Sequence, residues 1–116
     1  MKLARSIALA ATFLYVPLAK ADLADKLSKL TGYIIVDTKT VTARYDDGKR
    51  TEGFEGCQFG RVIVFQDNKT LTCAQYGYQY AYRPDAVILA KPMTFQSATT
   101  YDYKMIVGDE VYDMRR

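Results

Sequence analysis

Four tyrosines at alternate positions are the residues of this chain best suited to bind a ligand. They are Tyr76, Tyr78, Tyr80 and Tyr82, and Arg83 follows them directly. Alternate side chains of an extended strand point to one face, so the four rings would form a row. An exposed row could stack on a sugar, a peptide or a partner protein, with Arg83 as a polar neighbour. A buried or half-buried row would only be core packing.

The parity of the preceding residues bears on these two readings. Leu71 and Cys73 are apolar and odd-numbered, so we expect them to face the core. The even-numbered tyrosines would then face outward. A bulge near Gln75 or Gly77 would reverse that direction, so both readings stay open.

Few residues of this chain could carry catalysis. It has no histidine, which excludes Ser-His and Cys-His nucleophile systems and imidazole-based zinc sites. No glycine-rich phosphate loop or calcium-loop spacing is present. The acids that could form a hydrolytic carboxylate pair look like turn and surface residues; they are Glu52, Glu55, Asp109, Glu110 and Asp113. The sequence therefore predicts a protein that is not an enzyme and has no cofactor and no metal.

Cys57 and Cys73 are the only cysteines, with fifteen residues between them. A redox pair usually has the Cys-x-x-Cys spacing, and a metal pair would need further Cys or His ligands. In an oxidising compartment the pair predicts one structural disulfide. The loop-entropy estimate for that span is roughly 3 kcal/mol of stabilisation.

Residues 1–21 have the pattern of a signal peptide. Lys2 and Arg5 precede the apolar run Ser6–Leu18, which is too short to span a bilayer. Ala19-Lys20-Ala21 is a small-x-small cleavage pattern, with cutting expected after Ala21. The alternative is a buried N-terminal helix. A signal peptide predicts a periplasmic or extracellular protein, with no stable membrane insertion after cleavage.

Export changes the charge balance. The whole chain has 16 Lys and Arg against 13 Asp and Glu, and the first 21 residues contain three of the basic residues and no acid. The mature chain would then have thirteen charges of each sign. A nucleic-acid partner would require a basic face, and no basic surplus remains to form one.

The secondary structure needed to position these residues is mostly β. Leucines at 23, 27 and 30 predict a short helix over Asp22–Leu30 that docks by its leucine stripe. We expect strands over 33–45, 49–54, 61–65, 70–76 and 86–90, a loop over 95–100 and a closing hairpin over 103–114. If Phe65 pairs with Thr70, the disulfide must connect the Gly56–Gly60 loop, or an adjoining strand, across the sheet.

The fold class expected is therefore α+β and mainly β. A short N-terminal helix is followed by a five- to seven-stranded antiparallel sheet, curled or closed into a small barrel. Residues 22–116 would form one domain after the signal peptide of residues 1–21.

These features predict an exported, non-enzymatic binding protein. Its partner would be an envelope protein or a glycan, and the binding residues would be the tyrosine row with Arg83. One alternative is an inhibitor of a secreted hydrolase, for which the Gly53–Gly60 loop should protrude. Another is a small carboxylate-dependent hydrolase, which needs a cleft with two converging carboxylates. Nothing in the sequence indicates an oligomeric state.

Overall fold

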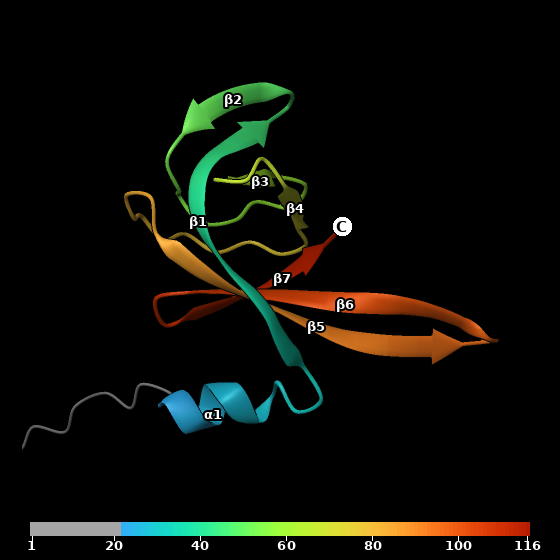
Figure 1. Cartoon of the computed structure of the whole chain (residues 1–116). Helices are drawn as coiled ribbons and strands as arrows, with labels where there is room; N and C mark the ends of the chain where they lie inside the picture. Colours follow the sequence, from blue (N-terminus) through green and yellow to red (C-terminus); the bar gives the residue numbers. More distant parts are fainter. Residues whose placement is uncertain (1–21) are drawn as a thin grey trace, which may run out of the picture.

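The computed structural model describes residues 22–116, so the predicted signal peptide lies outside the described residues. Seven strands follow one short helix, α1 (Leu23–Ser28), as Figure 1 shows. The strands are β1 (Ile34–Asp46), β2 (Lys49–Glu52), β3 (Val62–Phe65), β4 (Thr70–Cys73), β5 (Asp85–Phe95), β6 (Ala98–Val107) and β7 (Glu110–Arg115). Within these residues no helix is long and apolar enough to cross a membrane.

Six of the strands close into an antiparallel barrel. Their order is β1-β3-β4-β7-β6-β5, and a β1–β5 pairing completes the ring, while β2 pairs with β1 as an extra strand. This arrangement confirms the predicted fold class in its barrel form.

The long strand β1 closes the barrel, because it pairs both with β3 and with β5. Its first half pairs with β5 and its second half with β3 and β2. Each half contains a register shift, at Ile35/Asp37 in the half that pairs with β5 and at Val41/Ala43 in the half that pairs with β3. Such bulges bend a strand and increase its twist, so β1 can curve around the barrel.

The core lies inside the barrel and is filled by large side chains. Phe54 and Tyr112 pack edge to face, with ring centroids 5.9 Å apart. The fully buried side chains around them are Phe65, Ile63, Met105, Val41, Val107 and Cys73.

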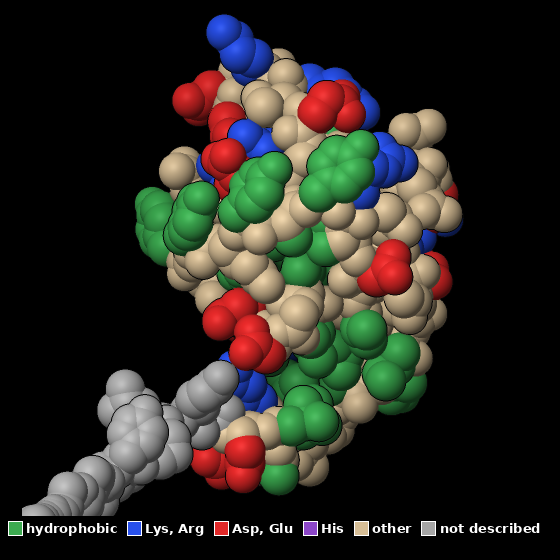
Figure 2. All heavy atoms as spheres, turned by 90° about the vertical axis from the view of Figure 1, so that its left-hand side faces the viewer, with side chains coloured by type: hydrophobic (Ala, Val, Ile, Leu, Met, Phe, Trp, Pro, Cys, Tyr) green, Lys and Arg blue, Asp and Glu red, His purple; other side chains and the backbone are tan. Residues whose placement is uncertain are grey.

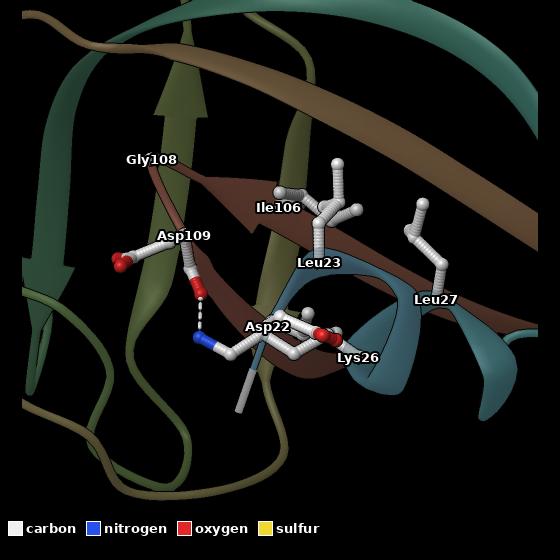
Figure 3. A pocket seen from close by; sticks show the side chains of 8 residues that line it. Asp22, Leu23, Lys26, Leu27, Ile106, Gly108 and Asp109 are labelled. Atoms are coloured by element: carbon white, nitrogen blue, oxygen red, sulfur yellow. Dashed lines mark hydrogen bonds between the residues drawn. The ribbon is translucent and has the colours of Figure 1, made fainter. Parts of the chain in front are cut away.

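The helix docks less completely than the leucine stripe predicts. Leu30, just beyond the helix, is buried, but Leu23 and Leu27 are 69% and 43% exposed. Figure 3 shows Leu23 beside Ile106 in a hollow of about 350 Å³, where Lys26 donates a hydrogen bond to the Asp109 carbonyl. The predicted docking by the leucine stripe is correct for Leu30 and wrong for Leu23 and Leu27, because these two line an open hollow instead of packing fully against the sheet.

The register of the β3–β4 hairpin also differs from the expected one. Val64, not Phe65, pairs with Thr70. Asn68 has a φ of 67°, and the Phe65 amide donates to the Lys69 carbonyl at 3.0 Å. This is a three-residue loop that ends in a left-handed residue, one residue shorter than the predicted four-residue turn.

The residues expected to form a loop over 95–100 instead continue two strands. β5 runs to Phe95 and β6 begins at Ala98, so only Gln96 and Ser97 form the turn. Both have positive φ, 50° and 70°. A Gln-Ser pair lacks the Asn or Gly that usually marks such a turn, which explains why the sequence pattern missed it.

Candidate functional site

The candidate site is the tyrosine row, defined as Tyr76, Tyr78, Tyr80 and Tyr82. It lies in the segment between β4, which ends at Cys73, and β5, which begins at Asp85. The side chains are exposed by 74%, 79%, 66% and 79%, respectively. Arg83, at the end of the row, is exposed as well. The structure thus decides between the two readings: the rings are on the surface.

The parity argument accounts for this exposure. Leu71 and Cys73 are buried, and the even-numbered tyrosines face away from them. However, the segment is not a continuation of β4 as expected. It is an extended stretch joined to its neighbours by two isolated bridges, Phe54–Ala81 and Cys57–Gly77. Side chains of an extended chain alternate in direction even where no strand pairs with it on either side. The four tyrosine side chains therefore still point to one face.

The odd-numbered residues between the tyrosines attach the segment to the barrel. The Gln79 side chain donates to the Val107 carbonyl at 3.0 Å and accepts from the Tyr112 hydroxyl at 2.7 Å. The Gln75 side chain accepts from the Asp113 amide at 2.7 Å. Gly77 and Cys57 exchange two backbone hydrogen bonds of 2.7 and 3.0 Å. Alternate residues therefore hold the backbone in place while the rings stay free.

Two glycines permit the close packing of the segment, Gly56 against the 53–61 loop and Gly77 against Tyr112. A Cβ atom on Gly56 would lie 2.0 Å from the Gly77 carbonyl oxygen, and one on Gly77 would lie 3.0 Å from the Tyr112 ring. Gly56 also has a φ of 82°, which favours glycine. Any larger residue at Gly56 would push the tyrosine segment outward, whereas one at Gly77 would press on the Tyr112 ring.

The disulfide and two buried arginines fix the loop behind the row. Cys57 is bonded to Cys73, with Cα atoms 5.6 Å apart, so the bond connects the loop to the end of β4. Arg61 donates to the Glu55 and Gly56 carbonyls at 3.3 and 3.2 Å. Arg44 donates to the Glu52 and Gly53 carbonyls at 3.1 and 3.0 Å. This confirms the predicted disulfide and its role across the sheet.

The carboxylates beside this loop are paired with those arginines. Asp46 accepts from Arg61 at 2.8 Å and lies 3.7 Å from Arg44, and Glu55 lies 3.4 Å from Arg44. Glu52 pairs instead with Arg50 at 3.2 Å. Glu52 and Glu55 are thus each paired with a different arginine.

The row borders a shallow hollow of about 370 Å³. The rings of Tyr76 and Tyr78 stand beside it, and its polar lining comes from Glu55, Gln58 and Arg61. Sequence reasoning named Glu55 only as a possible hydrolytic carboxylate and did not identify Gln58 or Arg61. No local pattern could place them beside the row, because the loop is joined to the tyrosine segment by two long-range bridges, Phe54–Ala81 and Cys57–Gly77.

The surface around the row is mixed rather than uniformly apolar. Figure 1 places the segment between β4 and β5 on the left-hand side, and Figure 2 views the molecule from that side. Hydrophobic side chains stand apart from one another in a row across the upper half of this face, with polar atoms between them. Separate rings offer individual stacking positions, each with its own phenol hydroxyl.

Behind the row, burial raises the pKa of Tyr112 to about 12, and the nearby Glu110 carboxylate acts in the same direction. The Tyr112 phenol therefore stays protonated and can donate its hydrogen bond to Gln79. Within residues 22–116, no group of three or more potential metal ligands is present. The arrangement can stack and hydrogen-bond a ligand, and its acids are neutralised by arginines.

No protein-family model, no curated protein and no solved structure matches this chain.

Proposed function

We propose that this protein is an exported, non-enzymatic binding protein that holds a cell-wall glycan on its tyrosine row. The observation that carries the proposal is the alternation itself. Four rings are 66–79% exposed, while the residues between them anchor the backbone to the core. A fold that only needed these tyrosines for stability would bury them.

The geometry favours a repeating, ring-containing ligand. Alternate residues of an extended chain are about 7 Å apart, so the row offers regularly spaced stacking positions. Tyrosine combines an apolar ring face with a hydroxyl that reaches water, which suits the apolar faces and the hydroxyl groups of sugars. The hollow beside Tyr76 and Tyr78 adds the polar groups of Gln58 and Glu55.

The inhibitor alternative has less support than glycan binding. In the Gly53–Gly60 loop, Phe54 and Cys57 are 0% and 3% exposed and both pair with the tyrosine segment, so only the end of the loop, at Gln58–Gly60, is exposed. An envelope protein is the other candidate ligand of the tyrosine row, because tyrosine and arginine are enriched at protein interfaces.

The site is tested by the double substitution Tyr78→Ser with Tyr80→Ser. We expect co-sedimentation with insoluble cell-wall glycan to be lost, while the melting temperature hardly changes, since exposed substitutions usually cost within about 0.5 kcal/mol. Leu23→Ser is the matched control, because Leu23 is also exposed, at 69%, but lies on α1.

Two results would count against the proposal. Unchanged glycan binding by the double variant would show that the row is not the binding site. Capture of an envelope protein by the wild-type chain, without any glycan binding, would replace the glycan by a protein partner.

Export is tested separately. The disulfide fits an oxidising compartment, and the signal peptide predicts a mature chain beginning at Asp22. Intact-mass measurement on the protein produced in its native host should give the mass of residues 22–116. A mass that includes Met1–Ala21 would refute both the cleavage and the neutral net charge.

A further inference from the structure

The β5–β6 hairpin extends beyond the barrel as a two-stranded ribbon, which projects to the right in Figure 1. β1 leaves β5 at the pair Ile34–Ala90, and β7 leaves β6 at the pair Tyr103–Met114. The β5–β6 pairing continues from there to Phe95–Ala98. Among the described residues, no other strand pairs with residues 91–102. An isolated two-stranded ribbon is at best marginally stable in water.

The ribbon also exposes large apolar side chains. Met93, Phe95 and Tyr101 are 48%, 74% and 55% exposed. Scattered exposed hydrophobic residues are ordinary. Here three of them lie within nine residues on a ribbon whose outer edges are unpaired in the described chain, and this combination marks an interaction site.

The turn determines which backbone groups face outward. Gln96 and Ser97, with φ of 50° and 70°, form a two-residue turn, so the flanking pair Phe95–Ala98 is hydrogen-bonded. Hydrogen-bonded and non-hydrogen-bonded pairs alternate along an antiparallel ladder. The amides of Thr99 and Tyr101 therefore point away from β5. The opposite turn, closed by Val107–Glu110, gives the same direction.

The two edges of the ribbon are protected differently. On β5, the outward position 92 is a proline, which has no N–H, and Lys91 precedes it. Proline and lysine are the usual means of preventing edge pairing. On β6, the stretch Ala98–Tyr101 has no proline and no charge. One edge is thus blocked and the other is open to a further strand.

We propose that the open β6 edge pairs antiparallel with the same edge of a second copy of this chain. The two-fold axis would pass beside Thr100, so Thr99 would exchange two hydrogen bonds with Tyr101 of the partner subunit. Tyr101 would do the same with the partner's Thr99. The dimer would convert two marginal ribbons into one four-stranded sheet.

The chemistry of this edge favours a copy of itself. Thr100 would lie opposite the partner's Thr100, and Thr99 opposite the partner's Tyr101; threonine pairs and aromatic–β-branched pairs stabilise antiparallel sheets. Asp102 would lie opposite the partner's Ala98, so no like charges meet. Met93 pairs with Thr100 and Phe95 with Ala98, which places both apolar side chains on the same sheet face as Thr100, next to the axis.

Sedimentation of the purified protein over a wide range of concentration tests the pairing. We expect a monomer–dimer equilibrium. Thr99→Pro removes the outward amide without removing a β5–β6 hydrogen bond, and it should raise the dimer Kd about tenfold or more, because two N–H···O bonds are lost per dimer. Thr94→Pro is the matched control, since Thr94 lies opposite Thr99 and its amide faces the other edge.

A cross-link gives a second measurement that does not depend on the proline variants. Residues of a non-hydrogen-bonded pair have Cα atoms about 4.5 Å apart, which is within disulfide range. Thr100→Cys should therefore form an intermolecular disulfide under mild oxidation, and Thr94→Cys should not. A wild-type protein that stays monomeric, equal weakening by both proline variants, or equal cross-linking at both positions would overturn the proposal.

Discussion

Replacing Gly56 by alanine should detach the tyrosine segment from the barrel. The new Cβ atom would lie 2.0 Å from the Gly77 carbonyl oxygen, whereas ordinary contact begins at 3.4 Å. The backbones would have to separate by more than 1 Å, since 3.4 − 2.0 is 1.4 Å. This would break the two Cys57–Gly77 hydrogen bonds of 2.7 and 3.0 Å.

The cost can be divided into two parts. A left-handed conformation costs a non-glycine residue roughly 1–2 kcal/mol. Each buried hydrogen bond that is broken adds about 1–1.5 kcal/mol. Gly56→Ala should therefore lower the free energy of unfolding by about 4 kcal/mol, which is a large share of a typical total of about 5–15 kcal/mol.

Gly60→Ala isolates the first part. Gly60 has a similar φ of 90°, and a Cβ atom there would meet nothing within 4 Å. This variant should lose only about 1–2 kcal/mol. In a domain of this size, the difference between the variants corresponds to roughly 10–20 °C in melting temperature.

Thermal and urea unfolding, followed by circular dichroism, measure both variants. The glycan-binding assay adds a functional readout, because Gly56→Ala should also disturb the tyrosine row. Equal stabilities of the two variants would refute the reasoning, since they would show that the close approach of Gly56 and Gly77 contributes nothing.

Three further predictions concern the same region. Replacing Cys57 and Cys73 by alanine should lower stability by roughly 3 kcal/mol in urea unfolding, and free thiols in protein taken from its native compartment would contradict a structural disulfide. Arg61→Met leaves the Glu55 and Gly56 carbonyls without their donor, so the free energy of unfolding should fall by about 3 kcal/mol. An unchanged free energy of unfolding would show that the loop holds its shape without Arg61. The pKa of Tyr112 is raised to about 12 from about 10 in the unfolded chain, so between these pH values the folded state retains a proton that the unfolded state releases. The free energy of unfolding should therefore fall by about 2–3 kcal/mol between pH 10 and 12. Tyr112→Phe should flatten this pH dependence.

Local patterns in the sequence predicted much of the fold. The disulfide, the β-rich class and the turn at Gly108–Asp109 all follow from spacing and residue type, and the structure contains each of them. Parity with Leu71 and Cys73 favoured an outward direction of the tyrosines but left the buried reading open, and the structure decided between them. Period-two alternation is a property of the extended backbone itself, so it holds even where the regular strand ends.

The tertiary structure alone decided which segments meet. Closure of the barrel through β1 and β5 joins residues about fifty positions apart, and no local pattern encodes that pairing. The register at Val64–Thr70 depended on Asn68 adopting a left-handed conformation, and the projecting ribbon depended on a Gln-Ser turn without glycine. The polar hollow beside the row lies where Gly56 lets the loop backbone come close to the backbone of Gly77. Spacing along the chain specifies the direction of a side chain, whereas the neighbours of that side chain are determined by long-range packing.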